Sequence, residues 1–368
     1  MSLLSLIQAA QSGLLKAMHA LGLSGEVAGQ PAWPFDSRID TGTLAIDPGL
    51  ERQLAWALGL SALALLLLLA GGWLRRRSRW AWAGAWAAAA ACVWLAPWPP
   101  LALLLTDAVP TSFHRSKTHF DAASIDRGLQ LFEAHCAACH GSDGRGEGPL
   151  AAQQRVWPPT LSAGLPWKRA EGELLWHVLH GMKDRSGAPT MPGFADRLQT
   201  ADVWALLDGM KALAAGDNLQ REKAWAWPVQ APTLAADCAR AWRGQRVRIV
   251  AADDGVPAPR EDPLFVTVML HRQPLAPGPD CAAGWRAYAR IAGVPDVSLA
   301  GTQFLVDRDG WLRAVNRPGE PAWSEDSLVC RSPNESPTPS GAAGLDALIA
   351  RIDADPVRLG DSGLPHTR

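Results

Sequence analysis

The sequence has 368 residues, enough for two or three compact units. Its formal net charge at pH 7 is −1, which gives no electrostatic reason to expect a nucleic-acid partner. Charged residues make up 19% of the chain, below the ~25% that is usual for soluble proteins. Trp is abundant with 18 residues while Tyr occurs once, and this imbalance needs a local explanation.

Two long uncharged segments predict a transmembrane helical hairpin. Residues 54–74 and 80–105 contain no charged side chain, and about 20 apolar residues suffice to cross a bilayer. Several tryptophans cluster in these two segments and at their ends, which is typical of an aromatic belt at the headgroup level. The alternative is a helical hairpin buried in a large soluble core, which uncharged segments of this length disfavour.

The short segment between the two spans sets their expected orientation. It reads RRRSR at residues 75–79, and a loop with four arginines should stay in the cytoplasm. Residues 51–106 are therefore expected to be a two-helix anchor, with everything after Leu105 on the outer face. The N-terminal residues 1–50 should lie on that same outer face.

The start of the chain allows two readings. Residues 2–23 are apolar on a helical period, and Lys16 and His19 are their only ionisable side chains. We expect an interfacial amphipathic helix, while a third span over residues 3–23 remains open. A cleaved signal peptide is disfavoured because the basic start is missing.

The segment CAACH contains Cys136, Cys139 and His140, and its spacing is the signature of covalent c-type haem attachment. Two thiols separated by two residues can reach two vinyl groups from one helical turn, and the histidine can ligate iron. A thioredoxin-type redox pair should follow a strand, whereas the preceding residues look helical. A zinc site needs a second ligand pair, and the sequence has no second C-x-x-C.

The location supports the haem interpretation independently. Bacteria attach haem c outside the cytoplasm, and the arginine segment already places these residues outside. The sequence therefore predicts a protein of the bacterial inner membrane, with one haem c in the periplasm.

The stretch GLQLFEAHCAACHGSDGRGEGP resembles the first helix and haem loop of class I cytochromes c, over roughly residues 123–214. The resemblance implies an all-α haem domain, which we assign to residues 107–220. Gly128 and Phe132 would then lie where the first helix crosses the last one, with Trp204 as the aromatic partner.

The same resemblance implies the surroundings of the iron. The carbonyl of Pro149 would accept the ring N–H of His140, which fixes the imidazole. Candidates for the sixth ligand are Met182, Met191, Met210, His177 and His180. The sequence Met-Pro-Gly-Phe before the last helix favours Met191, with Met182 as the runner-up. A His/Met pair is typical of electron transfer.

Residues 221–368 change in character and predict an α/β domain. Strand-like, helical and hairpin segments follow in the order β, β, α, β, β, α, which resembles a thioredoxin-like domain. Asp309 and Gly310 form a good turn signal in the hairpin. No C-x-x-C follows the first strand, and Thr302 and Gln303 stand where that family has a proline. We therefore expect a degenerate domain that docks rather than exchanges disulfides.

The remaining cysteines leave the disulfide pattern open. Two of Cys238, Cys281 and Cys330 could pair in an oxidising compartment, and the sequence does not say which. Cys92 lies in the second predicted span, where a packing role is expected.

The whole arrangement resembles the C-terminal part of membrane-bound cytochromes fused to copper-resistance D type domains. The larger bundle of spans is absent, so copper is not part of the predicted function. The fold prediction is multidomain: a transmembrane hairpin, an all-α cytochrome domain and an α/β domain. We expect an electron carrier that exchanges electrons with other redox proteins and binds the membrane but no nucleic acid. The alternatives are a haem-linked thiol–disulfide oxidoreductase and an accessory subunit of a copper-handling or respiratory complex.

Overall fold

The computed structural model describes residues 3–46, 48–74, 78–234, 244–253, 265–272, 281–320, 323, 345–359 and 365–366. The chain forms two compact units, the first built from residues up to Phe113 and the second from His114 to Arg358. Three of the sequence features lie outside the described residues: Arg75–Arg77, Cys238 and Cys330. The side chain of Cys281 is likewise not described.

The first unit is mostly helical. Its helices are α1 (Leu3–Ala20), α2 (Thr41–Ile46), α3 (Pro48–Leu74), α4 (Arg79–Trp94) and α5 (Leu101–Leu104). Its strands are β1 (Glu26–Val27), β2 (Gln30–Pro31), β3 (Ser37–Arg38) and β4 (Thr106–Asp107). The strands form two small antiparallel pairs, β1 with β2 and β3 with β4.

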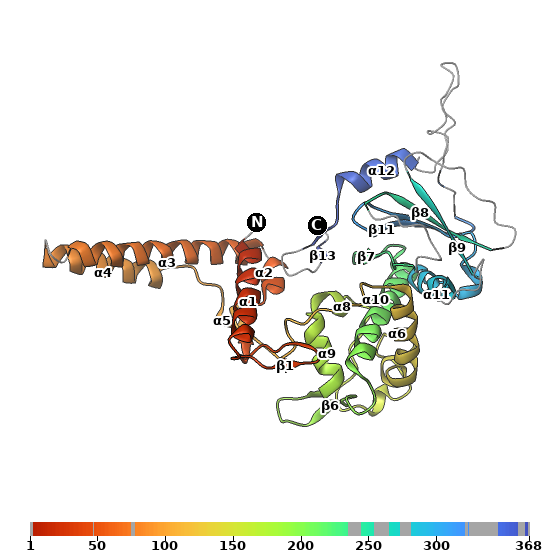
Figure 1. The fold of residues 1–368 in the computed structure, drawn as a ribbon, viewed down its shortest axis with the longest axis horizontal. Helices are drawn as coiled ribbons and strands as arrows, with labels where there is room; N and C mark the ends of the chain where they lie inside the picture. Colours follow the sequence, from red (N-terminus) through yellow and green to blue (C-terminus); the bar gives the residue numbers. More distant parts are fainter. Residues whose placement is uncertain are drawn as a thin grey trace, which may run out of the picture. The chain divides into compact units, whose positions relative to one another are not determined.

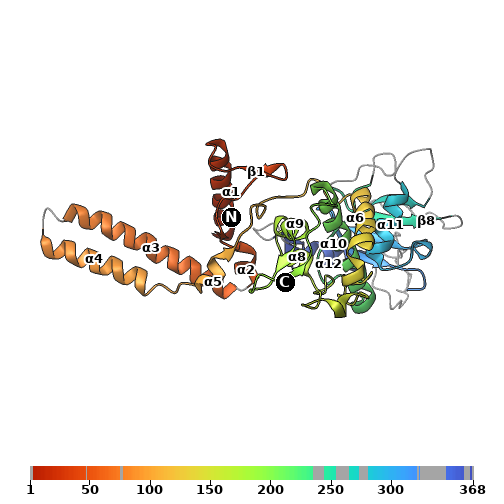
Figure 2. The same ribbon diagram turned by 90° about the horizontal axis from the view of Figure 1, so that it is seen from below.

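Helices α3 and α4 lie side by side as an antiparallel hairpin (Figures 1 and 2). Gly71 permits their close approach, because a Cβ at that position would lie 3.0 Å from the Cβ of Ala85. The hydroxyl of Ser78 accepts a hydrogen bond from the backbone N–H of Ala81 and so caps α4. The hairpin leaves large apolar side chains exposed, among them Leu66 at 62% and Trp94 at 85%.

The second helix of this hairpin is shorter than the uncharged residues 80–105, because the prolines that we expected to kink or end it follow directly. In the described part of the chain, one helix is long and apolar enough to cross a membrane, at Gly49–Gly72. Helix α4 has 16 residues and ends at Trp94. Pro97, Pro99 and Pro100 follow it, and proline removes backbone donors and stops the helix. Residues 80–105 therefore contain two helices separated by an irregular segment at residues 95–100.

The second unit begins with helices and a small hairpin. In chain order these are α6 (Ala122–His135), α7 (Ala137–His140), η1 (Ala151–Gln153), α8 (Leu165–Lys168), α9 (Glu171–His180), β5 (Met182–Lys183), β6 (Pro189–Met191) and α10 (Thr200–Glu222). A sheet region follows with β7 (Val229–Gln230), β8 (Val247–Ala252), β9 (Val266–His271), α11 (Cys281–Ala292), η2 (Asp296–Ser298), β10 (Gln303–Val306), β11 (Trp311–Asn316) and α12 (Leu345–Ala354). Two short strands close the chain, β12 (Arg358–Leu359) and β13 (Pro365–His366).

Helices α6 and α10 cross with their backbones in contact. A Cβ added at Gly128 would lie 1.8 Å from the carbonyl oxygen of Ala205, and one at Gly209 would lie 2.6 Å from the carbonyl carbon of Gly128. Phe132 and Trp204 are both buried beside this crossing. The predicted role of Gly128 is therefore confirmed, and Gly209 is its counterpart on the second helix.

The sheet has five strands in the order β7-β11-β10-β8-β9. Strands β8 and β9 are parallel, while β10 is antiparallel to both β8 and β11. Helix α11 covers one face of the sheet and α12 the other (Figure 1). Alternation along β10 explains this, because Phe304 joins the hydrophobic cluster of α11 and Leu305 joins that of α12.

The sheet region packs directly on the helical region through α11. A Cβ at Gly216 of α10 would lie 1.9 Å from the carbonyl oxygen of Arg290, so this contact also requires a glycine. The guanidinium of Arg286 donates two hydrogen bonds of 2.6 Å to the carboxylate of Asp126 on α6. One hydrophobic cluster includes residues from both regions. The boundary expected after residue 220 falls within α10.

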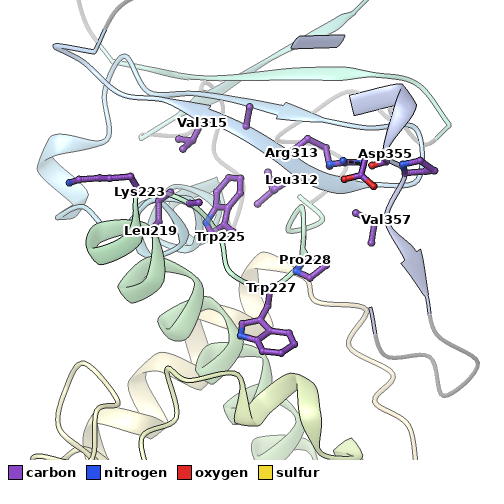
Figure 3. Close-up of a pocket in the computed structure, with 13 residues that line it drawn as sticks. Leu219, Lys223, Trp225, Trp227, Pro228, Leu312, Arg313, Val315, Asp355 and Val357 are labelled. Carbon is purple, nitrogen blue, oxygen red and sulfur yellow. Dashed lines mark hydrogen bonds between the residues drawn. The ribbon is translucent and has the colours of Figure 1, made fainter. Parts of the chain in front are cut away.

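The segment that follows α10 is packed against α11. Trp225 donates its indole N–H to the carbonyl of Ile291 at 3.2 Å. A cavity of about 340 Å³ opens beside it and is also lined by Leu312 and Arg313 (Figure 3). Arg313 is held by a hydrogen bond to the backbone carbonyl of Asp355.

A buried carboxylate ties the entry of the second unit to both crossing helices. Asp208 of α10 is 4% exposed and accepts hydrogen bonds from the hydroxyls of Thr118 and Ser124. Burial raises the pKa of Asp208 to about 6, although the bonds from Thr118 and Ser124 and the charge of Lys211 oppose that change.

This pKa predicts a loss of stability with rising pH. A carboxyl group with a raised pKa in the folded state stabilises the fold while it is protonated, and the contribution disappears as pH rises toward about 6. The contribution of Asp208 to the free energy of unfolding should fall by roughly 2–3 kcal/mol between about pH 4 and pH 6. Asp208→Asn should flatten this dependence in denaturant titrations of the holoprotein. Asp196→Asn, which alters a 67% exposed carboxylate, serves as control. An unchanged slope in the Asp208 variant would contradict the prediction.

Candidate haem-binding site

Two cysteines and a histidine lie at one short helix, with Cys136 as its N-cap. Helix α6 begins at the cap Asp121, whose carboxylate accepts the N–H of Ser124 at 2.8 Å, and it ends before Cys136. Helix α7 then carries Cys139 and His140. Both thiols are free and half-buried, although they are only three residues apart. Residues three apart share one face of a helical turn, so the arrangement can present two thiols to one planar group.

The ring of His140 is fixed by the carbonyl of Pro159. The distance from its Nδ1 to that oxygen is 3.3 Å, which leaves Nε2 as the nitrogen available for a metal. The prediction of Pro149 for this role is wrong. The loop after α7 folds back along the helix, where Leu150 donates its N–H to the carbonyl of Ala138 at 2.8 Å. Residue 149 therefore lies against the helix backbone, and the next proline segment reaches the ring.

The glycine-rich loop makes this return possible. Gly146 has φ of +85°, and a Cβ there would lie 2.3 Å from the carbonyl oxygen of Pro158. Its N–H bonds to the carbonyl of His140 at 2.7 Å. The backbone at Gly146 thus touches both the histidine and the proline segment that orients it, which only a residue without a side chain permits.

An ion pair fastens the same loop to the last helix. The guanidinium of Arg145 donates from Nε at 2.9 Å and from Nη2 at 2.5 Å to the carboxylate of Asp217. The Asp217 side chain is 4% exposed, so the pair is sheltered on one side. Charge-assisted bonds of this kind are stronger than neutral ones. The pair fixes the loop that carries Gly146 relative to α10.

The ionisation states differ from those of disulfide-exchange cysteines and suit ligation by His140. Burial, and then the neighbouring Cys139, raise the pKa of Cys136 to about 12, so the group stays a thiol. Cysteines used for disulfide exchange have lowered pKa values instead. Burial lowers the pKa of His140 against the opposing bond to Pro159, and a neutral imidazole is the form that binds metal. These residues fit one covalently bound haem.

The two methionine candidates face each other across a small hairpin. Strands β5 and β6 pair antiparallel with Met182 opposite Met191. Residues directly opposite in such a pair have side chains on the same face. Met191 is half-buried, whereas Met182 is 44% exposed.

The segment with Met191 is anchored to the end of α9. A Cβ at Gly181 would lie 2.6 Å from the carbonyl oxygen of Met191, and one at Gly193 would lie 2.7 Å from that of Leu179. The N–H of Phe194 then bonds to the carbonyl of Val178 at 3.0 Å. Backbone contacts on both sides of Met191 therefore restrict its position.

The loop of this hairpin is organised by Asp184. Its Oδ1 accepts the backbone N–H of Ser186 at 2.8 Å and that of Ala188 at 3.1 Å. Its Oδ2 lies 3.0 Å from Nε of Arg155, which precedes Pro159 by four residues. One exposed ion pair thus connects the methionine hairpin to the segment that orients His140.

The other ligand candidates have different surroundings. Met210 is buried in α10. His180 stacks on Trp176 with ring centroids 3.7 Å apart, and its Nδ1 lies 3.2 Å from the carbonyl of Trp176. His177 lies in α9 and is half-buried, and burial lowers its pKa.

Comparison with known proteins supports the haem interpretation. Residues 123–208 match the model of the family described as "Cytochrome C oxidase, cbb3-type, subunit III". No curated protein matched the chain. Among solved structures, a chain of the Kuenenia stuttgartiensis reducing HAO-like protein complex Kustc0457/Kustc0458 is 19% identical, with a TM-score of 0.24. That match covers 35% of this chain and 60% of the other chain, and at this TM-score it carries no argument.

Sequence reasoning did not identify Pro159, Arg145, Asp217 and Gly209. A second proline after the haem loop was the one signal that could have pointed to Pro159. The C-x-x-C-H spacing, the imidazole held through Nδ1 and the family match agree with one another. Residues 123–208 form a c-type cytochrome domain.

Proposed function

We propose that this chain is a membrane-tethered cytochrome with one haem c that passes single electrons between redox proteins in the bacterial periplasm. The placement of Cys136, Cys139 and His140 on one helical turn within the matched domain carries this proposal. Thioether bonds from the two cysteines would hold the haem, and the haem would supply one-electron chemistry. The protein residues fix its orientation through Pro159 and the haem loop.

His140 and Met191 are the proposed axial ligands. The half-burial of Met191 and the backbone contacts on both sides of it favour this residue over the exposed Met182. Two protein ligands fill both axial positions, which favours electron transfer over reactions with oxygen or peroxide.

Exposed apolar side chains on α3 and α4 support the membrane tether. A soluble protein rarely leaves so many large apolar residues in contact with water, and α3 has the length and composition of a span. The arginine-rich sequence at residues 75–79 supports a cytoplasmic location for the segment between α3 and α4 under the positive-inside rule. The cytochrome domain and the sheet region would then lie in the periplasm of a bacterial inner membrane.

The sheet region is proposed to be a thioredoxin-like domain without disulfide chemistry. The strand order β11-β10-β8-β9, with helices on both faces, supports this assignment. Thr302 precedes β10 and is fully buried. Because α11 packs on α6 and α10, the domain would act as a fixed part of the cytochrome and as a docking surface within a redox complex.

Covalent attachment is the first test of the proposal. The protein produced in cells competent for cytochrome c maturation should retain haem on a denaturing gel and stain for haem peroxidase. Replacing Cys136 and Cys139 with alanine should abolish the stain, whereas Cys92→Ala should leave it unchanged. A colourless band from the parent protein would refute the function.

The distal ligand is tested by a matched pair of substitutions. Met191→Ala should keep the haem but lower the midpoint potential by on the order of 0.1 V, within the ~0.8 V range that axial ligands control. The reduced variant should also bind carbon monoxide. Met182→Ala should neither lower the midpoint potential nor allow carbon monoxide to bind. The opposite pattern would make Met182 the ligand in place of Met191.

Topology can be measured by labelling with a membrane-impermeant thiol reagent. In a background without Cys92, Cys238, Cys281 and Cys330, a cysteine at Ser78 should react only after lysis of spheroplasts. A cysteine at Ala195 should react in intact spheroplasts, because the position is exposed in the cytochrome domain. Labelling at position 78 before lysis would show that the hairpin has the opposite orientation in the membrane.

A further inference from the structure

Helix α1 has an inverted distribution of polarity. Its glutamines face the protein: Gln11 donates from Nε2 to the carbonyl of Ile39 at 3.1 Å and accepts the N–H of the same residue at 2.9 Å. Gln8 accepts the hydroxyl of Thr41 at 3.0 Å. Leu4 lies on this inward side as well and is buried. The glutamine side chains of α1 therefore form hydrogen bonds inside the protein and do not face water.

The outward face of α1 is almost entirely apolar. Leu6 is 51% exposed and Leu14 is 46% exposed. At 100° per residue, the exposed apolar positions share an arc of about 140°. They are Leu6, Ala9, Ala10, Gly13, Leu14, Ala17 and Ala20. Lys16 at the edge of this arc and His19 beyond it are the exposed ionisable residues of α1. A helix packed on a soluble protein normally shows the reverse pattern, with polar residues outward.

The position of α1 beside the hairpin indicates which environment its outward face contacts. Leu4 of α1 packs in one cluster with Leu44 of α2 and Leu54 near the start of α3. Helix α1 therefore lies at the end of the hairpin that is opposite to the arginine segment. It runs crosswise to α3 and α4 in both views (Figures 1 and 2).

Further apolar side chains are exposed in the segment that leaves α4. Trp98 is 43% exposed, and Leu101 at the start of α5 is 68% exposed. Leu104 of α5 packs against the same cluster that holds α1. Tryptophan and leucine next to the end of a span are typical of the bilayer boundary.

We propose that the outward face of α1 lies in the outer headgroup–acyl boundary of the membrane that the hairpin crosses. The apolar arc would contact the acyl boundary, and Lys16 would reach the headgroups. A crosswise helix fits this boundary, whereas a helix that packs on other spans would run alongside α3. The inference rests on the proposed membrane tether and is independent of the haem ligands.

The test measures depth in the lipid bilayer. The full-length holoprotein is reconstituted into phosphatidylcholine–phosphatidylglycerol nanodiscs, with a fluorescent amino acid that is excited at longer wavelength than Trp at position 14. Nitroxide groups are placed either near the headgroup or near the end of the lipid acyl chain. The shallow group should quench at least about twofold more than the deep one, as expected for a helix in the boundary. Iodide in the buffer should quench little. Ratios at one position cancel any constant quenching by the haem.

Matched positions separate this inference from the membrane tether itself. A fluorophore at Leu66 of α3 should respond most to the deep nitroxide, and one at the exposed Glu26 should respond to iodide alone. If Leu66 responds to neither lipid, the tether fails. If Leu66 behaves as expected but position 14 responds mainly to iodide, α1 faces water and the inference is wrong. Dominant deep quenching at position 14 would instead make α1 a third span, and protection from every quencher would make it a protein contact. Either result overturns the inference.

Discussion

The second unit depends on the backbone contact between α6 and α10 at Gly128 and Gly209. No Cβ fits at this crossing, since one at Gly128 would lie 1.8 Å from the carbonyl oxygen of Ala205. Direct backbone contact of this kind fixes both the distance and the angle between two helices. Helix α6 leads into the cysteines and histidine of α7, while α10 holds the haem loop through Asp217. The crossing therefore determines where the candidate haem-binding residues lie relative to the rest of the domain.

The candidate haem site is built from separate segments that restrain one another. Pro159 orients His140, Gly146 touches both, and Arg145 ties their loop to α10. On the other side, Gly181 and Gly193 hold Met191 against the end of α9. A redox centre benefits from ligands that move little, since a rigid surrounding lowers the reorganisation that accompanies electron transfer. The single ion pair between Arg155 and Asp184 is exposed, so it contributes less than the backbone contacts.

Helix α10 also joins the cytochrome to the sheet region. Gly216 allows α11 to approach within backbone contact, and Arg286 pairs with Asp126 across the same junction. The sheet region lies on the α6 and α10 side of the domain, away from the β5–β6 hairpin (Figure 1). The methionine hairpin is therefore left uncovered by the sheet region. This geometry agrees with the proposal that the sheet region is a fixed part of the cytochrome and a docking surface, without disulfide chemistry of its own.

The sequence by itself determined the local chemistry. The C-x-x-C-H spacing and the uncharged residues 54–74 within α3 depend on neighbouring residues, so they can be read along the chain. The place of Gly128 at a helix crossing came from the resemblance to class I cytochromes c. Tertiary structure decided the features that depend on contacts between residues distant in the sequence. It selected Pro159 rather than Pro149 for His140, because several prolines follow the loop and spacing does not say which one comes back to the ring. It placed Met182 opposite Met191, a matter of hairpin register. It also turned the glutamines of α1 inward, because only the packing of α1 on residues 39–41 decides which side of the helix meets water or lipid.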